Sequence, residues 1–97
     1  MVKPNIIAKV YLYPTDEGGR QGPTPSNYIG FPLEFEGSYY DCRLLLDDIG
    51  SISPGETVEV PIIFLYSELI VPKLKIGSKF RLWERGFKGD GVVLDIL

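Results

Sequence analysis

The chain has 97 residues, 44% hydrophobic and 24% charged, which fits one globular domain, residues 1–97, with a core of its own. Its formal net charge of −3 argues against a basic nucleic-acid module, because such modules draw most of their affinity from contacts to phosphate. Eleven glycines and eight prolines lie between apolar runs rather than in a repeat, which indicates short strands and turns.

The cysteine content and the apolar runs indicate the compartment. Cys42 is the only cysteine, so no intramolecular disulfide can form, as is usual where thiols stay reduced. Residues 1–5 lack the apolar stretch of a signal peptide, and the longest apolar run, residues 62–66, is too short to span a bilayer. We therefore expect a soluble cytoplasmic protein with no membrane partner.

The first third of the chain predicts a strand, a long loop and a second strand. Residues 6–13 are rich in Ile, Val and Tyr and favour a strand. The glycines and prolines of residues 14–30 exclude a regular helix or a central strand. Residues 31–36 alternate in polarity, as half-buried strands do, and Pro32 favours an edge or the start of a strand because it has no N–H.

A hairpin is predicted next. A turn at Gly37–Ser38 leads into a strand at residues 39–46, with Cys42 on its inward face as a small core residue rather than a reactive thiol. Asp47 and Asp48 then break the pattern. Adjacent residues of a turn point in different directions, which disfavours a carboxylate pair for acid–base catalysis.

The second half of the chain predicts three more strands. A Ser-Pro-Gly-Glu turn at residues 53–56 precedes a strand at residues 57–65, and residues 68–72 fit a short strand or a connector. Residues 78–85 alternate as a strand. A glycine-rich turn, Gly86 to Gly91 with Asp90 as a turn residue, leads to a last strand at residues 92–97. Six short strands without helical periodicity predict an all-β barrel or sandwich.

The strand at residues 78–85 carries the most unusual surface chemistry. Phe80 and Leu82 share one face, whereas Trp83 shares the other with Lys79 and Arg81. We expect Trp83 to face outward, where an aromatic ring among cations resembles a binding surface for protein or single-stranded RNA. The alternative is an inward Trp83 whose neighbouring cations reach back to water.

Three segments together resemble one known domain. Residues 8–12 run into an Asp-Glu-Gly-Gly-Arg loop at Asp16–Arg20, and residues 53–58 read Ser-Pro-Gly-Glu-Thr-Val. Near the end, Phe-Arg-Leu-Trp-Glu-Arg-Gly at residues 80–86 is followed by Gly-Asp-Gly-Val-Val at residues 89–93. In this order and spacing, the segments are similar to the third, C-terminal domain of the elongation factor Tu family.

The resemblance implies a small antiparallel β-barrel. In the family this barrel packs on the GTPase domain and touches the T-stem backbone of aminoacyl-tRNA. Gln21 replaces the family's His, and residues 27–32 lack the Arg of the matching family stretch, which weakens the case for tRNA contact. The sequence has no Gly-x-x-x-x-Gly-Lys-Ser/Thr motif, so we expect no GTP binding.

We therefore predict a non-catalytic binding module, with no cofactor and no metal, that docks a protein partner. The resemblance suggests a translation factor, or a toxin that acts on one; the alternative is an RNA- or aminoacyl-tRNA-binding module. Arg20 either holds a phosphate or a partner's carboxylate, or pairs with Asp16, Glu17 or another nearby acid of the chain. The predicted partner-binding residues are Asp16, Glu17, Arg20, Arg81, Trp83, Arg85 and Lys88.

Overall fold

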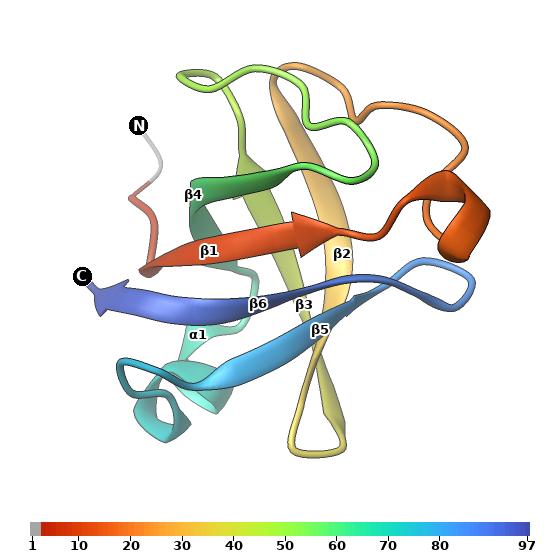
Figure 1. The fold of residues 1–97 in the computed structure, drawn as a ribbon. Coiled ribbons are helices and arrows are strands. Elements are labelled where there is room, and N and C mark those ends of the chain that lie inside the picture. Colours follow the sequence, from red (N-terminus) through yellow and green to blue (C-terminus); the bar gives the residue numbers. More distant parts are fainter. Residues whose placement is uncertain (1–2) are drawn as a thin grey trace.

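The strands of the protein close into a barrel. The structure is a computed structural model that describes residues 3–97, in which six antiparallel strands follow the order β1-β4-β3-β2-β5-β6 around the barrel (Figure 1). This confirms the predicted all-β antiparallel barrel. The strands are β1 (Ile6–Leu12), β2 (Tyr28–Phe35), β3 (Ser38–Leu45), β4 (Thr57–Phe64), β5 (Lys79–Trp83) and β6 (Phe87–Ile96).

Three short helical segments interrupt the connections. A 3₁₀ turn, η1 (Thr15–Glu17), lies in the loop after β1. One turn of helix, α1 (Ser67–Ile70), and a second 3₁₀ turn, η2 (Val71–Lys73), connect β4 to β5, where the sequence predicted a short strand or a connector. Within residues 3–97, no helix has the length and apolar character needed to cross a membrane.

The core follows from alternation along the strands. On β1, Ile6, Ala8, Val10 and Leu12 are fully buried, and β2, β4 and β5 bury every second residue over most of their length in the same way. Cys42 is 2% exposed, as predicted, and its burial raises the pKa of the thiol to about 12. The thiol therefore stays neutral and acts as an apolar packing group.

The β2–β3 hairpin closes one residue earlier than predicted. The turn is Glu36–Gly37, where both residues have positive φ, 51° and 86°, and Phe35 lies opposite Ser38. This is the two-residue turn that matches strand twist. β2 also begins at Tyr28, inside the predicted loop, because Gly30 is a strand residue and not a loop signal.

The β5–β6 hairpin corrects a second prediction. The turn spans only residues 84–86, and the predicted turn residue Asp90 lies within β6, where it accepts a hydrogen bond from Tyr13 Oη at 3.2 Å. Gly91 is required for packing rather than for a turn, because a Cβ there would overlap the ring of Phe80. The sequence shows a glycine in both cases and cannot separate these two uses.

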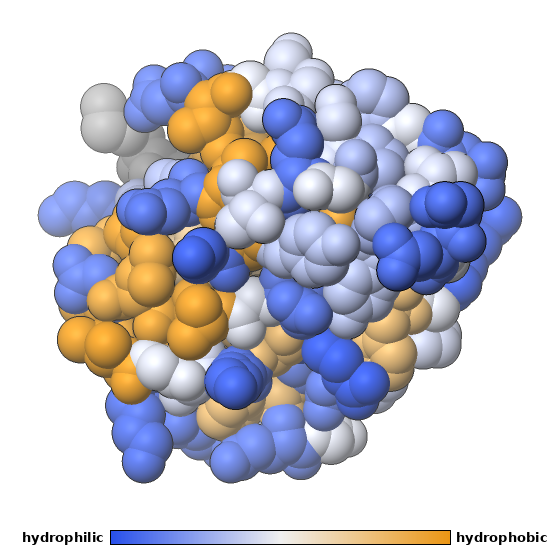
Figure 2. Space-filling model, viewed as in Figure 1, coloured by the Kyte–Doolittle hydropathy of each residue, from blue (hydrophilic) through white to orange (hydrophobic). Residues whose placement is uncertain are grey.

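The surface divides into two sides in the view of Figure 2. Apolar side chains gather where β6 ends, whereas hydrophilic residues cover the side of the loop between β1 and β2. The loop is tied down at Thr24, whose Oγ1 accepts the Ile52 N–H at 2.9 Å and whose own N–H donates to the Ile52 carbonyl at 2.9 Å. This anchoring holds the loop beside the barrel without regular structure.

Candidate partner-binding surface

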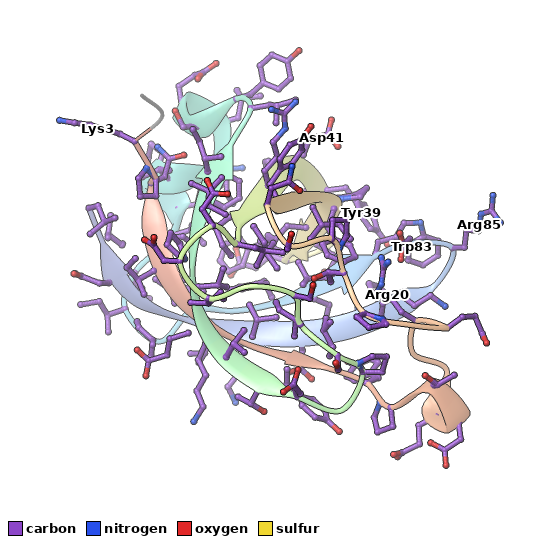
Figure 3. The ribbon with its side chains drawn as sticks, turned by 90° about the horizontal axis from the view of Figure 1, so that it is seen from above. Lys3, Arg20, Tyr39, Asp41, Trp83 and Arg85 are labelled. Atoms are coloured by element: carbon purple, nitrogen blue, oxygen red, sulfur yellow. The ribbon has the colours of Figure 1, made fainter. Side chains whose placement is uncertain are left out.

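The loop after β1 and the β5–β6 hairpin lie side by side. The Tyr13 N–H donates to the Lys88 carbonyl at 2.9 Å, and Lys88 Nζ donates to the Gly18 carbonyl at 3.1 Å. These were the two segments expected to bind a partner, and the fold brings them together from opposite ends of the sequence. Figure 3 shows Arg20, Tyr39 and Trp83 gathered on one side of the barrel, with Arg85 extending away.

Arg20 forms an ion pair within the chain. Its Nη1 lies 2.8 Å from Glu84 Oε1 and 3.0 Å from Oε2, and its Nε donates to the Gly22 carbonyl at 3.4 Å. The acid is therefore Glu84 of the hairpin, and neither Asp16 nor Glu17. With side-chain exposures of 18% and 43%, the pair fixes the loop against the hairpin more than it presents a free guanidinium.

The paired glycines of the loop have separate roles. Gly18 has a φ of 90° and ends η1, a conformation that strains other residues. Gly19 is buried, and a Cβ there would overlap the Tyr13 carbonyl. Asp16 and Glu17 remain exposed on η1, and among residues 3–97 neither takes part in an ion pair.

Trp83 faces outward, as predicted, with 38% of its surface exposed. Its ring centroid lies 5.1 Å from that of Phe87 at 84°, and 6.0 Å from that of Tyr39 at 79°. Both are edge-to-face arrangements, worth about 0.5–1.5 kcal/mol each beyond burial. Phe80 and Leu82 occupy the inward face of β5, which excludes the alternative of an inward Trp83.

Arg81 completes this group. Its guanidinium carbon lies 3.7 Å from the centroid of the Phe87 ring, and its Nε donates to Glu34 Oε1 at 3.0 Å. Glu34 also accepts the Gly37 N–H at 2.8 Å; this hydrogen bond first, and Arg81 second, lower the pKa of the carboxyl group. We call Tyr39, Arg81, Trp83 and Phe87 the aromatic surface.

The two remaining predicted residues lie at the edge of a hollow between loop and hairpin. Arg85 is exposed in the turn with a φ of 56°, and Lys88 is half-buried through its bond to Gly18. The hollow is lined by Arg20, Arg85 and Lys88 together with Glu84, Gln21 and two glycines. Its three cations and one acid make it locally positive on an acidic protein.

Sequence reasoning missed four residues of this surface: Glu34, Tyr39, Glu84 and Phe87. Alternation alone placed Tyr39 on the outward face of its strand, since Tyr40 and Cys42 claim the other face. Tyr39 contacts Trp83 across β2, because β3 and β5 flank β2 in the barrel. The sequence does not show this strand order. Phe87 was assigned to a turn because of the glycines that follow it.

Residues 3–97 hold no group of three or more His, Cys, Asp and Glu side chains close enough to share a metal ion. The aromatic surface presents large rings, one guanidinium and an exposed edge, which are groups that make contacts in protein interfaces. No model of a known protein family matches the chain, and a search of the curated proteins finds no match. The resemblance to elongation factor Tu therefore stays a prediction, whereas the closed barrel rests on the structure.

Proposed function

We propose that this barrel is a non-catalytic binding module that docks a protein partner through the aromatic surface and the adjoining loop. The observation that carries the proposal is the exposed cluster of Tyr39, Trp83 and Phe87, with Arg81 stacked on one ring. Trp, Tyr and Arg are the residue types that most often dominate the energy of protein interfaces.

The core does not need this cluster, which supports a role outside the fold. β5 contributes Phe80 and Leu82 to the interior, while Trp83 and Tyr39 remain 38% and 52% exposed. Because the rings already hold one another, they lose little freedom when a partner covers them. The cluster therefore has both the composition and the pre-organisation of an interface anchor.

The kind of partner is suggested by the resemblance to the third domain of elongation factor Tu. In that family the barrel packs on a GTPase domain, so we propose a protein of translation: a translation factor, or a toxin that acts on one. A cytoplasmic location belongs to the same proposal. The choice of a translation partner and of this location is argued from analogy with the family, whereas the binding role is argued from the aromatic surface itself.

A second candidate, RNA or aminoacyl-tRNA, is favoured by one observation. Arg20, Arg85 and Lys88 line a single hollow close to Trp83, and cations beside an aromatic ring suit a phosphate backbone and a stacked base. Two facts weigh against it: Glu84 neutralises Arg20, and the net charge of the chain is −3. We therefore rank the protein partner first.

The experiment is capture of partners from lysate on the immobilised protein, with and without nuclease, followed by affinity measurements on the purified partner. Trp83→Ala is expected to weaken binding by about 1–3 kcal/mol, within the range of interface anchors. The matched control is Ile76→Ala, an exposed apolar residue before the opposite end of β5, which should bind like the wild type.

Salt separates the two candidates. Binding of a protein should weaken only modestly between about 50 and about 200 mM salt, whereas binding of RNA should fall steeply as counterions are released. Equal affinity of Trp83→Ala and wild type for the purified partner would remove the aromatic surface from the proposal. Loss of capture after nuclease treatment, together with a steep salt slope, would replace the protein partner with RNA.

A further inference from the structure

The two-residue turn of the β2–β3 hairpin determines where the backbone of β2 points. In such a hairpin the residues flanking the turn, here Phe35 and Ser38, exchange hydrogen bonds, and bonded pairs then alternate along the ladder. The bond from the Leu46 N–H to the Asn27 carbonyl, at 2.7 Å, fits this alternation, in which odd-numbered residues before and within β2 bond to β3 and its continuation. The even-numbered residues of β2 therefore direct their N–H and C=O groups away from β3.

On that outer side, β5 covers only a short part of β2. The two strands are in register at Leu33 and Glu34 alone, because β5 ends at Trp83 and turns away. Pro32 lies where this pairing stops, in agreement with the predicted edge position, and has no N–H to leave unpaired. Residues 28–31 of β2 thus form an edge inside an otherwise closed barrel.

Gly30 is the free position of this edge. The Tyr28 N–H is satisfied by Asn27 Oδ1 at 2.8 Å, but no backbone bond outside the strand ladders engages the N–H or C=O of Gly30 within residues 3–97. Gly30 is exposed. A donor and an acceptor that point away from the edge of an exposed strand can pair with another extended chain.

The outer face above Gly30 is hollowed because the residue has no side chain. The hollow is mainly apolar and is lined by Phe31, Pro32, Asp41, Cys42, Arg43 and Leu65. A Cβ at Gly30 would have Cys42 O at 3.7 Å as its nearest neighbour, so the space is open to a side chain. In sheets, a large ring on the adjacent strand commonly covers such a glycine.

The charged side chain paired with Gly30 is a cation, and a second cation follows the end of β5. Arg43 lies opposite Gly30 on β3, with its guanidinium carbon 5.1 Å from the centroid of the Tyr28 ring, and Arg85 lies just beyond the end of β5. Among residues 3–97, neither guanidinium takes part in an ion pair. Asp41 is the acid in the lining of the hollow, opposite Pro32.

We propose that an extended segment of the partner protein adds to β2 as a strand at Gly30, with a large apolar residue in the hollow and acidic residues on either side. This deepens the proposed function, on which it rests, by naming the chemistry of the partner. Pairing with a second copy of this chain is disfavoured, since a two-fold axis at Gly30 would place the Arg43 guanidinium of both copies on one face of the joined sheet.

The test uses the full ¹⁵N-labelled chain and two capped peptides, Thr-Glu-Val-Phe-Val-Glu-Thr and its counterpart with Lys in place of Glu. The acidic peptide should slow hydrogen exchange of the Gly30 amide, and the basic peptide should require at least about tenfold higher concentration for the same effect. An unchanged Gly30 amide, or equal binding of both peptides, would overturn the proposal.

Two substitutions examine the two parts of the site. Gly30→Pro removes the donor and should raise the Kd of the acidic peptide about three- to tenfold, the loss expected for one hydrogen bond. Gly30→Tyr keeps the N–H but fills the hollow, and should weaken binding at least as much; it also serves if the proline variant fails to fold. Ile76→Ala, at an exposed residue before the opposite end of β5, is the control.

The outcomes separate this inference from the proposed function. If Trp83→Ala weakens binding of the purified partner while the Gly30 amide is unaffected by either peptide, the aromatic surface stands and the strand addition is wrong. If Gly30 is protected by the acidic peptide and Trp83→Ala binds the partner like the wild type, the edge stands and the aromatic surface is wrong. Wild-type affinity of both Gly30 variants for the acidic peptide would also reject the edge.

Discussion

Two regions of the barrel expose large apolar side chains, and they differ in how those side chains are held. At the aromatic surface, Trp83 touches both Tyr39 and Phe87, and Arg81 stacks on Phe87. Ile76, before β5, and Leu97, after β6, are more exposed, 68% and 62% against 38% for Trp83, but as aliphatic groups they have no such directional contacts.

The difference teaches that exposed apolar area is a poor guide to a binding surface. Single exposed aliphatic residues are normal on soluble proteins. A set of rings and a guanidinium that order one another is a different feature, because its side chains lose little entropy when a partner covers them. Contacts, rather than exposure, distinguish the aromatic surface from the aliphatic region of Ile76 and Leu97.

The largest expected effect comes from detaching the loop that borders the aromatic surface. Gly19→Ala places a Cβ where the Tyr13 carbonyl lies, so either the loop or the end of β1 must shift. We expect a loss of about 3 kcal/mol in the free energy of unfolding, at the upper end for overpacking. Gly22→Ala, three residues further on, meets no atom within 4 Å and should change little in urea denaturation.

A double-mutant cycle tests whether the rings hold one another. Trp83→Ala, Phe87→Ala and the double variant should give a coupling energy of about 0.5–1.5 kcal/mol in unfolding, the range for edge-to-face pairs. Ile76→Ala should stay within about 0.5 kcal/mol of wild type, as most surface substitutions do. A coupling energy of zero would show that the aromatic surface is no better ordered than Ile76.

The Arg20–Glu84 pair is expected to contribute less. Both residues are partly exposed, so the cycle of Arg20→Ala and Glu84→Ala should give a coupling below about 1 kcal/mol that shrinks as salt is added. Denaturation at low and high ionic strength measures this directly. A coupling that does not respond to salt would mean that the pair is more protected from solvent than its exposure indicates.

The smallest effect concerns pH at the other end of the aromatic surface. The pKa of Glu34 is lowered below its ordinary value of 4.5 by the Gly37 N–H and by Arg81. A depressed pKa in the folded state stabilises the protein above the unfolded value, and this contribution is lost as pH falls from about 4.5 through the folded pKa. Glu34→Gln should therefore flatten the fall in stability over that window, as urea titrations at several pH values would reveal.

Local sequence was sufficient to predict much of the barrel. Alternation placed Cys42 inside and Trp83 outside, and the Ser-Pro-Gly-Glu segment makes the predicted turn, with Gly55 at a φ of 90° and the Glu56 N–H on the Ser53 carbonyl. Besides the β2–β3 turn, which was placed one residue too late, the errors lie at Gly30 and Gly91. Both sit inside strands, Gly91 against the Phe80 ring and Gly30 beside open space, but the sequence shows the same letter that it uses in turns.

What the sequence by itself determined is the face on which each side chain lies, because a strand alternates faces regardless of its neighbours. Only the tertiary structure decided which strands adjoin. The order β1-β4-β3-β2-β5-β6 puts Tyr39 near Trp83 and joins Arg20 to a glutamate 64 positions away. It also leaves Gly30 without a strand partner on the side away from β3, because β5 ends before reaching it. These contacts arise when the barrel closes, since closure sets the register between strands that are distant in the chain.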